Sequence, residues 1–139
     1  MYSDKNLIYI FTILEAIEKI SLYTQKFEDE EEFYHSESQL YFNAVVNLLI
    51  AIGEENKKID QGIKDDYPFA WSNVSKMRDK MAHNYRGVSA YTVWDIVQNW
   101  LPQYKALLLE ILPKVEDFQE ALEDALNSQY YTHLEYLKK

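Results

Sequence analysis

The sequence predicts an all-α fold, and three observations carry that prediction. Glycine and proline occur three times each in 139 residues, so signals that break helices are few. Apolar residues recur every three or four positions, which is the spacing of a helix, and do not alternate as in a strand. A chain of this length can bury about two-thirds of the surface that its unfolded form exposes, so we expect one domain over residues 1–139.

Composition and charge limit the cellular compartments and the classes of binding partner that we expect. The chain has no cysteine, which excludes disulfides, thiolate metal sites and a cysteine nucleophile. This composition fits a reducing compartment, and we expect a cytoplasmic location. The net charge of −9 argues against a protein that coats nucleic acid, because phosphate groups would be repelled at long range. Any contact with nucleic acid is therefore expected to be local.

The first helix is expected to follow Ser3 or Asp4 as its N-cap and to run to about Phe27. Polar residues interrupt its apolar segment, so neither a signal peptide nor a membrane span is predicted. The apolar residues form two seams, Leu7, Ile10, Leu14 and Ile17 on one and Tyr9, Ile13, Ala16, Ile20, Tyr23 and Phe27 on the other. Two seams suit a central helix of one bundle, or a helix that buries one seam against a partner chain.

A second long helix is predicted to end at about Lys58. The acidic run at residues 28–32 is expected to be a solvated loop, and Ser36 with Gln39 resembles a capping box that opens the helix. Its polar residues include Gln39, Asn43, Asn47 and Glu54, which project within about 80° of one another on a helical wheel. They either face solvent or line a polar cleft. Gly53 is expected to allow the close approach of another helix.

The second half of the chain is predicted to contain shorter helices. A linker at residues 60–68 precedes a helix over about residues 73–82, for which Ser72 is the expected N-cap. Ser89 is expected to cap the next helix, which starts near residue 91. Pro102 and Pro113 fall where a helix should kink or restart. The pattern from residue 115 to residue 137 predicts one or two further amphipathic helices.

The stretch "RDKMAHNYRG" at residues 78–87 is the candidate site, because it is a cationic island in an acidic chain. Arg78 and His83 are five residues apart, which places them about 140° from each other on a continuous helix. They can converge on one phosphate if the helix unwinds near Ala82 or if a second protomer supplies part of the set. Asp79 and His83 are at positions i and i+4, so the carboxylate can orient the imidazole, although such pairs are also common on helix surfaces.

An arginine and a histidine suffice for one kind of RNA cleavage. The imidazole would remove the proton of a ribose 2′-hydroxyl, which attacks the adjacent phosphate, and the guanidinium would stabilise the developing charge. No metal is needed for this reaction. The histidines at 35, 83 and 133 have no metal-ligand spacing, and the sequence contains no Gly-rich phosphate loop.

The chain resembles HEPN domains, and the HepT-like toxin group in particular. Arg78, His83 and Tyr85 match the signature R-X4-6-H-X-Y, and the flanking segments "FNAVVNLLIAIGEENKKI", "YPFAWSNVSKMRDKMAHNYRGV" and "VWDIVQNWLPQYKALL" occur in the family's order. The similarity covers residues 4–112, with an additional segment over residues 113–139. Asn84 departs from the family, which often has an acid at this position.

The resemblance implies an up-and-down HEPN bundle of about four to six helices that forms a homodimer, with the signatures of both chains in one cleft. It implies a cytoplasmic, metal-independent ribonuclease toxin of a HepT/MntA-type (type VII) toxin–antitoxin system, acting on RNA such as tRNA. Arg78 and His83 would be catalytic, supported by Asp79, Lys80, Asn84 and Arg86. A cognate MntA-like nucleotidyltransferase would silence the toxin by transferring AMP from ATP to Tyr85. The protein itself would need no cofactor.

A different class of function also fits the same residues. The chain could be a non-catalytic HEPN module that serves as the partner or substrate of a nucleotidyltransferase. The ribonuclease interpretation predicts toxicity when the chain is expressed alone, whereas the binding-module interpretation predicts a stable complex without toxicity.

Overall fold

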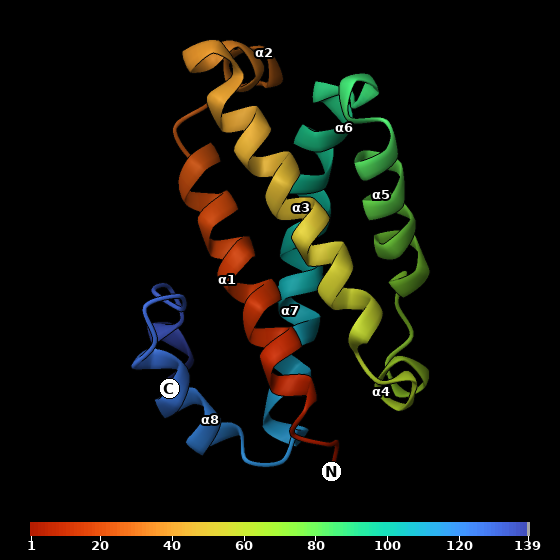
Figure 1. Cartoon of the computed structure of the whole chain (residues 1–139), viewed down its shortest axis with the longest axis vertical. Helices are drawn as coiled ribbons and strands as arrows, with labels where there is room; N and C mark the ends of the chain where they lie inside the picture. Colours follow the sequence, from red (N-terminus) through yellow and green to blue (C-terminus); the bar gives the residue numbers. More distant parts are fainter. Residues whose placement is uncertain (139) are drawn as a thin grey trace.

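The computed structural model describes residues 1–138 as a bundle of helices, and no strand occurs within this range. Four longer helices run along the long axis of the molecule in Figure 1, namely α1 (Asn6–Thr24), α3 (Leu40–Lys58), α5 (Trp71–His83) and α7 (Leu101–Ile111). Four shorter helices join or follow them, namely α2 (Glu30–His35), α4 (Gln61–Asp66), α6 (Ala90–Asp95) and α8 (Phe118–Leu126). The predicted all-α class is confirmed. Within the described part, no helix is long and apolar enough to cross a membrane.

Helix α1 is buried on both of its apolar seams. Leu14 of one seam and Ile13 of the other are fully buried, so most of α1 is covered by the rest of the same chain. This favours the central position over burial of a whole seam against a partner. The helix is shorter than predicted at its C-terminal end, since it stops at Thr24, and its N-cap is Lys5 without a side-chain hydrogen bond.

The acidic run is not the loop that its charge predicted. Asp29 is the N-cap of α2, and its Oδ1 accepts a hydrogen bond from the backbone N–H of Glu32 at 2.9 Å. In return, Oε1 of Glu32 accepts from the backbone N–H of Glu28 at 2.8 Å. Carboxylates are stabilising at a helix N-terminus because they satisfy free N–H groups and meet the positive end of the helix dipole. The run therefore starts a helix.

The start of α3 was also placed wrongly by the sequence pattern. Ser36 and Gln39 lie in a tight 3-10 segment (Ser36–Gln39) in which Glu37, Ser38 and Gln39 have φ angles of 49°, 54° and 71°. These left-handed conformations cannot continue a right-handed helix, so α3 begins at Leu40 without a side-chain cap. Its predicted end at Lys58 is confirmed.

The second half of the chain follows the prediction more closely. The linker contains the short helix α4, and α5 is longer than predicted because it extends from Trp71 to His83. The expected cap at Ser89 is confirmed, since its Oγ accepts from the backbone N–H of Thr92 at 3.3 Å. A π-helical turn (Ile96–Trp100) leads into α7, where Pro102 has no N–H to donate to an earlier carbonyl.

A buried asparagine, Asn56, joins three helices. Its Nδ2 donates to the carbonyl of Trp71 at 2.9 Å and to Oγ of Ser75 at 3.0 Å, both on α5. Its Oδ1 accepts from the hydroxyl of Tyr104 on α7 at 2.7 Å. Burial raises the pKa of Tyr104, so this hydroxyl keeps its proton even further above neutral pH than an exposed tyrosine does. Every polar atom of the Asn56 side chain therefore has a partner, as burial requires.

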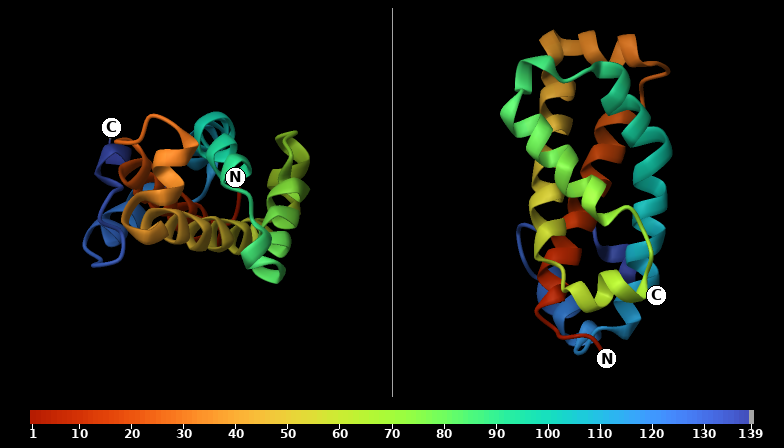
Figure 2. Two further views of the ribbon diagram at one scale, coloured as in Figure 1. Left: turned by 90° about the horizontal axis from the view of Figure 1, so that it is seen from above. Right: turned by 90° about the vertical axis from the view of Figure 1, so that its right-hand side faces the viewer.

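The segment after α7 lies along α1, at the edge of the molecule opposite α5 (Figures 1 and 2). It contains one α-helix, α8, with a 3-10 turn before it (Leu112–Lys114) and another after it (Glu135–Lys138). The carboxylate of Glu15, which is fully buried on α1, accepts hydrogen bonds from the backbone N–H of His133 at 2.8 Å and from the hydroxyl of Thr132 at 3.3 Å. Nδ1 of His133 also lies 2.6 Å from this carboxylate. One buried carboxylate thus fixes the C-terminal segment to α1.

We expect Asn56→Ala to lower the free energy of unfolding by about 2–3 kcal/mol, because it leaves buried groups of Trp71 and Tyr104 without partners. Asn47→Ala is the matched control, since Asn47 lies on the same helix and is exposed, and it should change stability by less than about 0.5 kcal/mol. Urea unfolding followed by circular dichroism measures both. Equal effects of the two substitutions would show that Asn56 does not join the helices.

Candidate active site

The signature residues lie on α5 and on the 3-10 turn (Tyr85–Gly87) that follows it. Helix α5 remains α-helical through His83, and the chain leaves the helix only at Asn84, with φ −133° and ψ 58°. Of the two ways in which Arg78 and His83 could converge, unwinding of the helix near Ala82 is not observed. Five residues of regular helix keep Arg78 and His83 about 140° apart, so a single chain does not aim both side chains at one phosphate.

Arg78 packs directly on the backbone of α3 at Gly53. A Cβ atom added to Gly53 would lie 2.2 Å from Cβ of Arg78 and 3.2 Å from the carbonyl oxygen of Val74. No side chain fits in this space, which confirms the predicted role of Gly53. The next residue of α3 then reaches the guanidinium, because Oε2 of Glu54 lies 3.3 Å from Nε of Arg78.

Asp79 is the second carboxylate beside Arg78. Its Oδ1 accepts hydrogen bonds from Nζ of Lys57 at 2.7 Å and from Nη1 of Arg78 at 3.3 Å. The hydrogen bond from Lys57 is the main reason why the pKa of Asp79 lies below its ordinary value. Among residues 1–138, Asp79 makes no contact of this kind with His83, so the pairing expected from their spacing is not formed. The sequence alone did not indicate Lys57 as the partner of Asp79, because this contact depends on how α3 and α5 cross.

Several polar groups of the stretch remain available to a substrate. His83 is exposed, and its ring makes no hydrogen bond with any described residue; the same holds for Nη2 of Arg78. The ammonium of Lys80 and the guanidinium of Arg86 form no ion pair within residues 1–138. Free cationic donors at the end of one helix suit the oxygens of a phosphate backbone.

Tyr85 lies against the N-terminal half of α3. Its hydroxyl donates to Oδ1 of Asn43 at 3.3 Å, and the residue is 38% exposed. The predicted polar stripe consists of Gln39, which directly precedes α3, and of Asn43, Asn47 and Glu54 on α3. Asn43 and Glu54 of this stripe contact signature residues, whereas Asn47 between them is exposed. The polar residues of α3 therefore contribute to the candidate site. They do not merely face solvent, which was one of the two alternatives.

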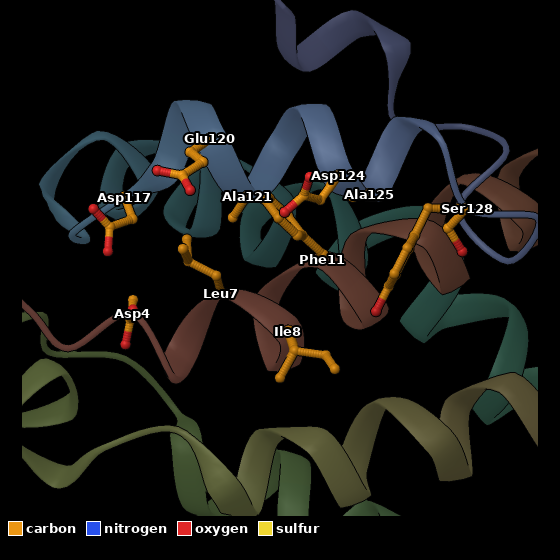
Figure 3. A pocket seen from close by; sticks show the side chains of 11 residues that line it. Asp4, Leu7, Ile8, Phe11, Asp117, Glu120, Ala121, Asp124, Ala125 and Ser128 are labelled. Atoms are coloured by element: carbon orange, nitrogen blue, oxygen red, sulfur yellow. The ribbon is translucent and has the colours of Figure 1, made fainter.

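A groove between α1 and α8 has the opposite character (Figure 3). Its volume is about 430 Å³, and Leu7, Ile8 and Phe11 contribute apolar surface from α1. The carboxylates of Asp4, Asp117, Glu120 and Asp124 surround it. Four acids repel phosphate, so this groove is a poor site for RNA. In the described part of the chain, no three His, Asp or Glu side chains are grouped to hold a metal ion.

Comparisons with known proteins show the family to which the chain belongs. The family model described as "Ribonuclease HepT-like" matches residues 13–111. A Methanocaldococcus jannaschii protein named "Putative RNase MJ1216" is 34% identical over 113 residues, which are 81% of this chain and 91% of the relative. A Thermococcus cleftensis protein named "Probable ribonuclease HepT" is 34% identical over 98 residues, 70% of this chain and 86% of the relative. No solved structure gives a significant match.

The matched region contains α3, α5 and α7 and the C-terminal part of α1, as well as the whole stretch from Arg78 to Gly87. Both relatives are named as ribonucleases, and each is covered over most of its length. The helical bundle, the cationic signature and the relatives agree, and the chain belongs to the HepT-like ribonuclease family of HEPN proteins.

Proposed function

We propose that the chain is an RNA endonuclease whose active site is completed in a homodimer. The observation that carries the proposal is the arrangement of Arg78 and His83, which are held on one regular helix with their side chains directed apart. A two-fold axis near α5 would bring Arg78 of one protomer toward His83 of the other. Membership of the ribonuclease family supports RNA as the substrate.

The proposed reaction needs an imidazole, a guanidinium and the 2′-hydroxyl of the substrate. His83 accepts the 2′-hydroxyl proton while O2′ attacks the adjacent phosphorus. The bond from phosphorus to O5′ breaks, and O5′ takes a proton from water. The products are a 2′,3′-cyclic phosphate and a 5′-hydroxyl. Arg78 donates to the phosphate oxygens as their charge increases, and Glu54 and Asp79 hold its guanidinium in place.

We further propose that the protein is the toxin of a toxin–antitoxin pair, with tRNA among its targets, and that an MntA-like nucleotidyltransferase silences it with AMP on Tyr85. The exposed hydroxyl of Tyr85, two residues after His83, supports this assignment. An adenylyl group there adds a negative charge and bulk at the place where the RNA backbone must bind. The chain itself needs no cofactor, because ATP is consumed by the antitoxin.

Arg78→Ala and His83→Ala should each lower the RNA cleavage rate at least about a hundredfold. A mixture of the two inactive variants, unfolded and refolded together, should recover about a quarter of the wild-type activity. Random pairing makes about half of the dimers mixed, and each mixed dimer has one of its two sites with both Arg78 and His83. Gel electrophoresis of cleaved RNA in EDTA measures the activity. Active single variants would contradict the catalytic assignment, whereas inactive variants that stay inactive when mixed would contradict the shared site.

Gly53→Ala should lower the cleavage rate at least about tenfold, because the new Cβ pushes Arg78 away from Glu54. Gly62→Ala is the matched control, since nothing lies within 4 Å of a Cβ atom added there. Gly62→Ala should leave cleavage unchanged and stabilise α4 by about 0.5–1 kcal/mol. If Gly53→Ala is fully active, the contact between α3 and α5 does not position Arg78.

Incubation with the nucleotidyltransferase and ATP should add AMP to the wild-type chain and abolish cleavage. Tyr85→Phe should remain unmodified and active. Tyr91→Phe is the control, because Tyr91 is more exposed, at 66%, and lies on α6 outside the signature. Intact-mass and peptide mass spectrometry measure the modification. AMP found on Tyr91, or on wild-type and Tyr85→Phe chains equally, would show that Tyr85 is not the target.

A further inference from the structure

A pocket of about 320 Å³ lies between the C-terminal end of α5, the turn after it and α6. Its apolar surface comes from Met77, Met81, Val88 and Ile96, and its polar rim from Lys80, Asn84, Ser89 and Thr92. Lys80, Asn84, Ser89 and Thr92 are exposed, whereas Met81 is buried. The pocket is therefore an open hollow with an apolar floor, large enough for part of a small ligand.

Two residues of the pocket rim flank the proposed catalytic histidine in the sequence, although His83 itself does not line the pocket. Asn84 follows His83 directly, and Lys80 precedes it by one helical turn. The side chain of Asn84 packs over Gly87, since a Cβ atom added to Gly87 would lie 2.3 Å from Nδ2. Gly87 has an ordinary negative φ angle, so it is required here for space and not for backbone conformation.

The chemistry of the rim favours a nucleobase over a purely apolar ligand. The side-chain amide of Asn84 makes no hydrogen bond with residues 1–138, and an amide both donates and accepts, as the edge of a base does. The ammonium of Lys80 is free for a phosphate. The floor offers sulfur and aliphatic atoms to the face of a ring. Sequence-specific recognition of single-stranded RNA uses such pockets for bases that are turned out of the stack.

We propose that this pocket holds one unpaired base of the RNA substrate, from a nucleotide next to the cleaved bond. The proposal rests on the proposed ribonuclease function and adds the element that selects where the RNA is cut. If the phosphate of the cleaved bond lies beside His83, the base of a neighbouring nucleotide can enter the pocket between α5 and α6. Asn84 contacts the edge of that base, and Met77 and Met81 contact its face.

The test uses single-stranded RNA around a mapped cleavage position, with 2′-O-methyl groups to prevent cleavage and one abasic nucleotide moved along the chain. For the wild-type protein, fluorescence anisotropy should show binding weakened about tenfold when the abasic nucleotide is next to the cleaved bond, which is near the lower end of what one base stacked on an aromatic side chain contributes. Abasic nucleotides farther away should have little effect.

Thr92→Trp places a large side chain over the pocket and should weaken the binding of intact RNA about tenfold. It should also abolish the effect of the abasic nucleotide, since the base then has no site. Asn84→Leu keeps a similar volume without the amide and should reduce the preference among the four bases at that position. Ile8→Trp is the control, because Ile8 is exposed and lines the acidic groove of Figure 3. It should behave as wild type.

The outcomes separate the two proposals. Failure of the wild-type protein to bind or cleave RNA would overturn the proposed function, and the base pocket with it. If wild type cleaves RNA but the abasic effect is the same in Thr92→Trp, the base lies elsewhere and the pocket assignment is wrong. If Thr92→Trp changes the dimer to a monomer in light scattering and leaves the abasic effect unchanged, the pocket is a protein contact and not a base site.

Discussion

The approach of α5 to α3 at Gly53 is the constraint on which the candidate site depends. With no side chain at that position, the stem of Arg78 lies directly on the backbone of α3. The guanidinium then reaches Glu54, and Asp79 reaches Lys57. These groups form one alternating row of charges across two helices. Asn56, two residues after Glu54, joins α3 to α5 and α7 from within the core. Packing and charge thus fix the position of Arg78 together.

The distribution of charge reconciles an acidic protein with an acidic substrate. The chain carries a net charge of −9, yet residues 78–87 contain Arg78, Lys80 and Arg86, and neither Lys80 nor Arg86 forms an ion pair within the described residues. The carboxylates of the groove in Figure 3 lie beside α1, at the opposite edge. In the proposed complex, RNA would approach this cationic stretch, because the acidic remainder of the surface repels phosphate groups at long range.

The features that depend on periodicity and local chemistry could be predicted from the sequence. Contacts between segments that are distant in the sequence could not. The helical class, the end of α3 at Lys58, the cap at Ser89 and the close approach at Gly53 all follow from local patterns. The start of α3 was missed because three left-handed residues precede it. The partners of Asp79 and the burial of Glu15 were missed because they depend on the crossing of helices and on a segment more than a hundred residues away. The signature residues themselves were readable, but their mutual geometry was not.

The bond between Glu15 and the C-terminal segment makes that segment a dependent part of the domain. The matched family region ends at residue 111, which invites the view that the rest is a removable appendix. Yet Glu15 lies inside the matched region, and its carboxylate is buried because residues 132–133 supply its donors. A chain shortened after α7 would lose the donors to Glu15 and would uncover apolar surface of α1, such as Phe11, which packs on Tyr131. The extension is therefore not an independent appendage, because a buried residue of the matched region takes its hydrogen bonds from it.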